Sequence, residues 1–153
     1  MIKIRDASLN DVEKLQRLND EVFLDNYKYD NDLDTDWAKS EKGKDYFMSL
    51  LNNPESVCLI AEDEGSEVGY IAAKKNDFGY RKSKYLEIEN MGVIPDYRSK
   101  GIGSRLIAEC IKQAKEKGFD RVYVNSYFKN AGAINFYKEN GFSEIDISLE
   151  RVL

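Results

Sequence analysis

The sequence predicts a single domain, residues 1–153, of the mixed α/β class, in which helices cover a central sheet. Short β-rich runs alternate with longer segments whose apolar residues recur at helical spacing. One of these runs leads through a glycine-rich turn directly into a helix. The composition agrees with one folded domain, because 42% of the 153 residues are hydrophobic, 33% are charged and only two are proline.

The first half of the chain predicts one strand, two helices and a hairpin. Residues 2–5 alternate like a strand, and residues 56–62 and 67–74 are β-rich runs separated by a turn of hairpin length. A second helix is expected around residues 37–51, and the acidic stretch 20–36 is expected to be a loop before it. The first helix is predicted by an apolar stripe at Val12, Leu15, Leu18 and Val22.

The second half predicts three strands that alternate with two helices. Residues 85–93 form a strand in which Gly92 indicates a bulge or splay, and residues 121–126 and 142–152 form the later strands. Residues 131–140 form the last helix. The helix before it is predicted by apolar residues at Leu106, Ile107, Cys110, Ile111 and Ala114. The predicted order is β-α-α-β-β-β-α-β-α-β.

The absence of histidine limits which catalytic groups and metal sites the chain can have. Without histidine, Ser-His-Asp and Cys-His nucleophiles are excluded, and so is any ordinary zinc site. Cys58 and Cys110 stand apart and are expected to be buried thiols, so we predict no metal. Proton transfer near neutral pH must then use carboxylates, tyrosine, lysine or water.

The net charge and the apolar runs limit which classes of partner the chain can bind. A net charge of −5 argues against nucleic acid and favours a cationic acceptor. No apolar run has the length of a membrane span, and the first residues lack the apolar core of a signal peptide, so no membrane partner and a cytoplasmic location are expected.

A turn built to hold an anion joins the strand at residues 85–93 to the following helix. Unpaired backbone N–H groups and the positive end of the helix dipole converge there, so a phosphorylated cofactor is expected. A Walker A loop does not fit the spacing, and Leu106 stands where a dinucleotide fingerprint needs glycine. The turn consists of Arg98, Ser99, Lys100, Gly101, Ile102, Gly103 and Ser104.

Two patterns together resemble the GNAT superfamily of acyl-CoA-dependent N-acetyltransferases. The first is Arg-x-x-Gly-x-Gly at residues 98–103, preceded by Val-x-Pro-x-Tyr at residues 93–97. The second is Asn-x-x-Ala-x-x-Phe-Tyr at residues 130–137, followed by Gly-Phe at residues 141–142. The strong part of the resemblance covers residues 85–142. The alternative is that Gly101 and Gly103 only form a tight loop that binds nothing. The presence of the second pattern makes this alternative remote.

The resemblance implies a central mixed sheet of about six to seven strands, splayed between the fourth and fifth. Family members often end in two strands, whereas only about eleven residues follow Phe142 here. We therefore expect that the final hairpin is absent or is completed by a neighbouring chain in a homodimer.

The resemblance also implies acetyl-CoA as the co-substrate. Its pyrophosphate would lie on the amides of residues 98–104, where Gly101 and Gly103 would permit close approach and positive φ. Its pantetheine arm would pair with the backbone of Met91 and Val93, and the Met91 N–H would face the thioester oxygen as an oxyanion donor.

The second pattern supplies a candidate general acid and a candidate cofactor contact. Tyr137 would protonate the departing thiolate or donate a hydrogen bond to its sulfur, although an aromatic at this helical spacing is also an ordinary packing residue. Asn130 stands where a helix N-cap belongs, and the matching family position also contacts the cofactor arm.

Two carboxylates are candidate bases for the acceptor amine. Glu87 and Glu89 precede Met91 by four and two residues, and burial beside the strand would raise the pKa of either. Both are expected on the same side of the strand as Met91, and they would point toward the splay if Met91 does. A solvated or salt-bridged carboxylate is the alternative for each.

The acidic stretch is a candidate acceptor pocket. Carboxylates interleaved with aromatic rings favour a cationic amine, although a solvated acidic loop is the plainer interpretation. The candidate acceptor contacts are Tyr27, Tyr29, Asp30 and Trp37.

Together these features predict an N-acetyltransferase that moves an acetyl group to a primary amine of a small cationic molecule. The amine would attack directly, through a tetrahedral intermediate and without a covalent enzyme intermediate. A protein N-terminal or lysine acetyltransferase and a non-catalytic acyl-CoA-binding or regulatory module are the alternatives.

Overall fold

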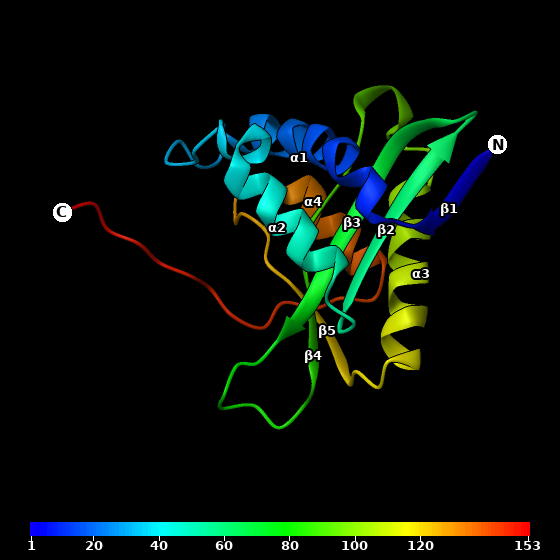
Figure 1. The fold of residues 1–153 in the computed structure, drawn as a ribbon. Helices are drawn as coiled ribbons and strands as arrows, with labels where there is room; N and C mark the ends of the chain where they lie inside the picture. The colour runs from blue at the N-terminus through cyan, green and yellow to red at the C-terminus, as the bar shows by residue number, and fades with distance from the viewer.

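A five-stranded mixed sheet forms the centre of the protein in the computed structural model, which describes residues 1–153 (Figure 1). The strands lie side by side in chain order, from β1 to β5. Helices α1 and α2 pack on one face, and α3 and α4 pack on the other. The elements are β1 (Ile2–Asp6), α1 (Val12–Asn26), α2 (Glu41–Leu51), β2 (Ser56–Asp63), β3 (Ser66–Asn76), β4 (Tyr85–Val93), α3 (Ile102–Glu116), β5 (Arg121–Val124) and α4 (Ala131–Glu139).

The sheet opens between β4 and β5, as the resemblance implies. Strands β1 to β4 pair in antiparallel fashion, whereas β5 pairs with β4 in parallel fashion. The parallel pairing covers only Tyr85–Ile88 opposite Arg121–Val124. Because β5 ends there, the rest of β4, residues 89–93, has no strand beside it on that side. This unpaired stretch of β4 faces the gap in the sheet.

A bulge interrupts β4 one residue before the open stretch. Ala72 of β3 pairs with Asn90, and Ala73 pairs with Ile88, so Glu89 is an extra residue on β4. A bulge changes which face the following side chains occupy. Glu89 therefore bonds Tyr46 of α2, and the next residue, Asn90, points to the same face.

Each face of the sheet carries its own hydrophobic core. The core under α3 includes Leu106, Ile107 and Cys110, and the core under α1 and α2 includes Leu15, Phe47 and Cys58. Both cysteines are buried and unbonded, as predicted. Burial raises the pKa of each thiol to about 12, so neither is a ready nucleophile.

The acidic stretch is helical over its first part, which corrects the prediction of a loop over residues 20–36. Helix α1 continues to Asn26, so the connection is limited to residues 27–36. Two acidic residues of this helical part pair with basic residues outside α1. Asp20 pairs with Lys39, and Asp25 pairs with Arg98.

The predicted last strand is absent, so the sheet has five strands and not six or seven. Beyond residue 142 no backbone group bonds to another backbone group, and residues 143–153 extend away from the body (Figure 1). A strand forms only against a partner edge, and this segment makes no backbone hydrogen bond to the free edge of β5. Strand β5 is also shorter than the expected 121–126, ending at Val124. None of the helices combines the length and apolarity needed to cross a membrane.

Candidate active site

A run of unpaired backbone amides lies at the start of α3. The N–H groups of the six residues from Ser99 to Ser104 have no backbone or side-chain acceptor within the protein. Ser99, Lys100 and Gly101 are exposed, so solvent can reach this turn. Unpaired amides at a helix N-terminus form an anion-binding site. The residues present therefore fit the diphosphate group that the sequence predicts.

The two glycines of the turn have different roles. Gly101 has φ of 80°, which glycine adopts without strain. Gly103 does not have positive φ, which corrects that part of the expectation. A Cβ at Gly103 would lie 2.9 Å from Cζ of Phe136, so this glycine lets α4 pack closely on the first turn of α3.

The carbonyl of Val93 faces the open edge of β4. The N–H of Ile94 donates to the carbonyl oxygen of Val68 on β3 at 2.9 Å. The Val93 carbonyl belongs to the same trans peptide group and points the opposite way, so it points away from β3. It accepts from Nε of Arg98 at 2.8 Å. Backbone groups in a strand alternate in direction with a period of two, so Met91 presents its N–H to the same open edge.

Tyr137 carries a hydroxyl group without a partner. Its ring packs edge-on against Phe136 and Phe142, with centroids 5.4 Å and 5.6 Å away. The hydroxyl makes no hydrogen bond to the protein. Burial raises the pKa of this phenol to about 12, so it stays protonated across the range in which enzymes work.

Glu87 is a partly desolvated carboxylate. Burial raises its pKa above the usual range, and the charge of Glu89 adds to this effect. Two neighbours oppose the shift: the amide of Asn76, which donates to Oε2 at 2.6 Å, and the ammonium of Lys74. A carboxylate with a raised pKa is suited to accept a proton from an amine.

Glu89 lies in a polar cluster beside α2. It accepts a hydrogen bond from the hydroxyl of Tyr46 at 2.7 Å, and Nζ of Lys74 lies 3.6 Å away. The two glutamates share the face covered by α1 and α2, as predicted. Met91 packs in the core under α3, so the expectation that it points with them is wrong. The bulge at Glu89 is the reason, because it reverses the alternation.

The candidate acceptor residues separate into two groups. Tyr29 stacks with Tyr127 at 6.0 Å, and the hydroxyl of Tyr127 donates to Asp30 at 2.9 Å. Trp37 lies elsewhere, stacked on Phe23 at 5.5 Å and edge-on to Tyr46. Tyr27 is exposed and contacts neither group through its ring.

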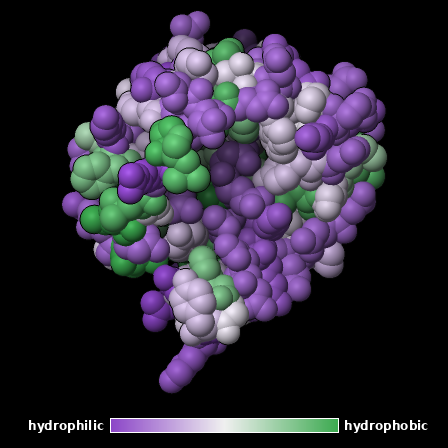
Figure 2. All heavy atoms as spheres, turned by 90° about the vertical axis from the view of Figure 1, so that its left-hand side faces the viewer, coloured by the Kyte–Doolittle hydropathy of each residue, from purple (hydrophilic) through white to green (hydrophobic).

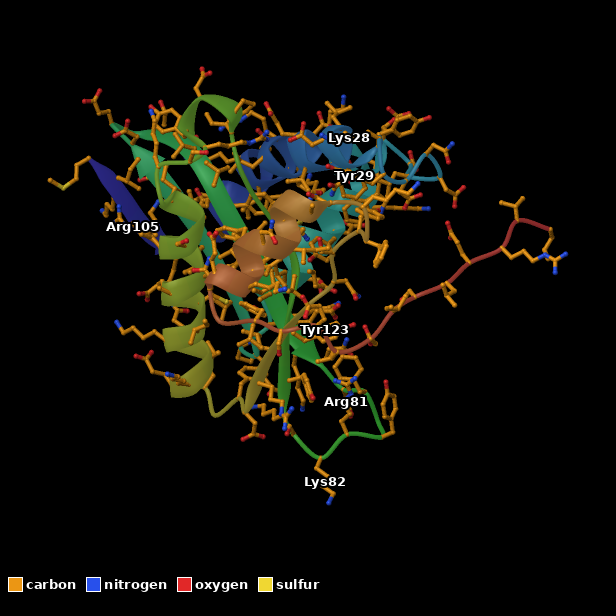
Figure 3. All side chains as sticks on the ribbon, turned by 180° about the vertical axis from the view of Figure 1, so that it is seen from behind. Lys28, Tyr29, Arg81, Lys82, Arg105 and Tyr123 are labelled. Carbon is orange, nitrogen blue, oxygen red and sulfur yellow. The ribbon has the colours of Figure 1, made fainter.

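A hollow of about 1600 Å³ lies between β5, α4 and the C-terminal segment, whose residues 143–150 line it. Tyr29, Asp30 and Tyr137 line it, and Figure 3 shows Tyr123 of β5 near the point where the C-terminal segment begins. Glu87, Glu89 and Met91 are not part of its lining. The hollow therefore adjoins only the Tyr137 side of the candidate site.

Asn130 caps α4. Its side-chain oxygen accepts from the N–H of Ala133 at 3.0 Å, as the capping interpretation predicts. The contact to a cofactor arm stays a prediction.

The family model described as the acetyltransferase (GNAT) family matches residues 15–142. The chain belongs to this family. The match covers both sequence patterns and the elements that carry them, and it confirms the resemblance.

Individual GNAT relatives agree with this assignment. An uncharacterised N-acetyltransferase of Methanocaldococcus jannaschii is 31% identical over 147 residues, covering 94% of this chain and 62% of the relative. An N-alpha-acetyltransferase of Sulfurisphaera tokodaii is 29% identical, covering 95% of this chain and 82% of the relative. The chain thus spans less than two thirds of the first of these relatives. The solved aminoglycoside N-acetyltransferase AAC(6')-Iy in complex with CoA has a TM-score of 0.78 at 17% identity, covering 100% of this chain and 95% of that one.

Sequence reasoning missed the polar network that surrounds Glu89 beside the candidate site. The hydroxyl of Tyr46 accepts from Nδ2 of Asn90 at 3.2 Å, and the amide of the fully buried Asn19 donates to the hydroxyl of Tyr70 at 2.9 Å. Burial, with the charge of Glu89, raises the pKa of Tyr46, so this phenol is a hydrogen-bond donor to Glu89. Helix α2 and β4 meet only in the folded chain, so no local pattern signals the contact.

Proposed function

We propose that the chain is an N-acetyltransferase that moves the acetyl group of acetyl-CoA to a primary amine of a cationic small molecule. The observation that carries the proposal is the run of six unpaired amides, Ser99 to Ser104, next to the open edge of β4. This arrangement offers a diphosphate site next to a strand edge to which an extended ligand can bind.

The backbone provides most of the donor site in this proposal. The amides of residues 99–104 hold the diphosphate, and Met91 and Val93 pair with the pantetheine arm. Acetyl-CoA supplies an acyl group that is already activated as a thioester. The complex of the similar AAC(6')-Iy with CoA supports this choice of donor.

Three groups of this chain act on the reacting atoms. The Met91 N–H stabilises the oxygen that gains negative charge, and removing such a donor typically costs about 2.7–4 kcal/mol of transition-state stabilisation. The Tyr137 hydroxyl donates a proton or a hydrogen bond to the departing sulfur. Glu87, or Glu89 through water, takes the proton that the amine loses. The buried cysteines argue for direct attack on the thioester.

The acceptor is proposed to be cationic because carboxylates lie both at the hollow and on β4. Asp30 lies with Tyr29 and Tyr127 at the rim of the hollow, and Glu87 and Glu89 lie on β4. The similar aminoglycoside acetyltransferase acts on a molecule of this charge class. A protein N-terminal amine is the second candidate, since the S. tokodaii relative is named for that activity.

A thiol-release assay tests the proposal. The full chain is incubated with acetyl-CoA and, in separate reactions, a polyamine, an aminoglycoside, a peptide with a free N-terminus and a neutral arylamine. The proposal predicts the fastest release with the polyamine or aminoglycoside. Release with the peptide alone would favour the second candidate. Amine-independent release, or none with any acceptor, would contradict acetyl transfer and leave a non-catalytic module.

A further inference from the structure

Three aromatic rings surround the guanidinium of Arg81, which lies on the loop between β3 and β4. Its Cζ atom is 4.7 Å from the ring centroid of Phe78, 5.2 Å from that of Tyr85 and 5.7 Å from that of Tyr80. The rings also pack on one another, because Phe78 is edge-on to Tyr85 at 4.9 Å and to Tyr80 at 6.2 Å. Phe78, Tyr80 and Tyr85 therefore form an aromatic cage that holds a cation.

The cation in this cage is weakly attached to the rest of the protein. Nη1 of Arg81 donates to the hydroxyl of Tyr85 at 3.1 Å, and no carboxylate forms an ion pair with Arg81. Residues 77–84 lie outside every helix and strand, so the side chain can turn into solvent without unfolding an element. Tyr80 is 78% exposed, so the cage is open to solvent. A cation from solution that replaced Arg81 would regain the same ring contacts.

The cage opens on the hollow of the candidate active site. Arg81 and Tyr85 both line this hollow, and Figure 2 shows the surface hollowed on this side, above the loop that carries the cage. Figure 3 shows Arg81 directed toward Tyr123 of β5, whereas Lys82 points away from it. The cage is therefore reached from the side at which an acceptor would enter.

The cage also lies close to the carboxylate proposed as the base. Tyr85 and Glu87 stand two residues apart in the regular part of β4, so their side chains share one face and their Cα atoms are about 6.6 Å apart. Glu87 pairs with Tyr123 across the sheet. A molecule whose amine reaches Glu87 can thus place a second group in the cage if a short chain joins the two.

The chemistry of the cage selects the kind of group that it holds. Ring faces attract ammonium and guanidinium groups, and they also pack against the methylene groups that carry such cations. The Arg81 side chain has both parts. Resting on the proposed acetyl transfer, we propose that the aromatic cage binds a second cationic group of the acceptor, which displaces Arg81. The acceptor is then an alkyl amine with another ammonium or guanidinium group at the far end of its chain.

Calorimetric binding of butylguanidine tests the cage without acetyl transfer, because this probe carries a guanidinium but no primary amine. Arg81 competes with the probe for the cage, so Arg81→Ala should bind the probe at least about 10-fold more tightly than wild type. Lys82→Ala is the matched control. It removes the same charge from the same loop but not from the cage, and it should change the affinity less than about 3-fold.

A ring variant separates the cage from a general effect of charge. Tyr80→Leu, added to Arg81→Ala, should abolish the gain in affinity, and the exposure of Tyr80 means that the fold should not suffer. Unchanged, weaker or absent binding of butylguanidine in Arg81→Ala would overturn the proposal. An equal gain in Lys82→Ala, or a gain that survives Tyr80→Leu, would overturn it as well.

Turnover then links the cage to the acceptor. The KM for diaminobutane should be at least about 10-fold lower than the KM for butylamine, which has the same chain and one cation fewer. Arg81→Ala should lower the KM for diaminobutane and leave that for butylamine unchanged. Equal KM values for the two amines would overturn the cage as an acceptor site while acetyl transfer stands. Absence of acetyl transfer to any amine, with tight binding of butylguanidine in Arg81→Ala, would instead overturn the proposed function and leave a cation-binding cage.

Discussion

Nε of Arg98 donates a hydrogen bond to the carbonyl oxygen of Val93 at 2.8 Å. This bond ties the amide turn to the open edge of β4, the two backbone features that the donor site needs. The guanidinium also pairs with Asp25 of α1 at the surface. Arg98 thus fixes the position of the turn relative to the strand, although the anion site itself is made of backbone.

Replacing Arg98 with Ala should weaken CoA binding about 10-fold, because the turn loses its attachment to β4; a lost hydrogen bond of about 1.4 kcal/mol corresponds to that factor. The dissociation constant for CoA, measured by calorimetry, checks this. Asp25→Asn is the control, since it removes only the exposed ion pair, and it should change affinity less than about 3-fold. Equal losses in both variants would show that the ion pair, and not the bond to Val93, positions the turn.

Replacing Tyr137 with Phe should lower kcat by about 100-fold or more, the range typical of a lost general acid. The CoA dissociation constant should stay within about 3-fold, because the ring and its packing remain. Tyr123→Phe is the matched control, since Tyr123 lines the same hollow and donates only to Asn125. An unchanged kcat in Tyr137→Phe would remove this residue from the chemistry.

As pH is lowered, kcat/KM should begin to fall at a higher pH than it would if the base were a glutamate with an ordinary pKa. Burial raises the pKa of Glu87, and the base works only when it is ionised, so activity is lost as pH falls through this raised pKa. The phenol of Tyr137, with its pKa of about 12, should cause no loss of activity below about pH 11.

Glu87→Gln should remove this acid limb and lower the rate, and Glu89→Gln identifies the alternative base. Because the folded-state pKa of Glu87 is raised, its ionisation opposes folding, and that penalty appears as pH rises above the unfolded value. The Gln variant should therefore be no less stable than wild type at pH 7. A full rate with the acid limb retained in both variants would exclude both carboxylates as the base.

Replacing Gly103 with Ala should destabilise the fold by about 1–3 kcal/mol, because the new methyl group would meet the ring of Phe136 at 2.9 Å. The free energy of unfolding in urea measures the loss. Gly132→Ala on α4 is the control, because its nearest neighbour would lie 3.8 Å away. That variant should be neutral or up to about 1 kcal/mol more stable. A Gly103→Ala variant as stable as wild type would mean that α3 and α4 separate easily here.

Features that depend on neighbouring residues could be predicted from the sequence. The stripe that ends at Ala114 marked α3, and the spacing of Gly101 and Gly103 marked the amide turn. The open side of β4 was expected from the family resemblance that these patterns carry, and the parallel pairing with β5 ends at Ile88 as that expectation requires.

Features that depend on register or on a distant partner could not be predicted. The bulge at Glu89 arises from how β4 pairs with β3, and it moved Met91 to the opposite face from the glutamates. The bond from Tyr46 to Glu89 joins residues 43 positions apart. The C-terminal segment has strand-like alternation, but alternation alone does not supply a partner edge, so the last strand did not form.

Calorimetric titration of the full chain with CoA and with pantetheine, which lacks the diphosphate, tests the central claim most directly. If the amides of residues 99–104 hold the diphosphate, CoA should bind at least about 100-fold more tightly than pantetheine, a difference of about 2.7 kcal/mol. Lys100→Glu, beside the turn, should weaken CoA binding, whereas Lys112→Glu, on the exposed side of α3, should leave it unchanged. Equal affinity for CoA and pantetheine, or no binding of CoA, would contradict the account.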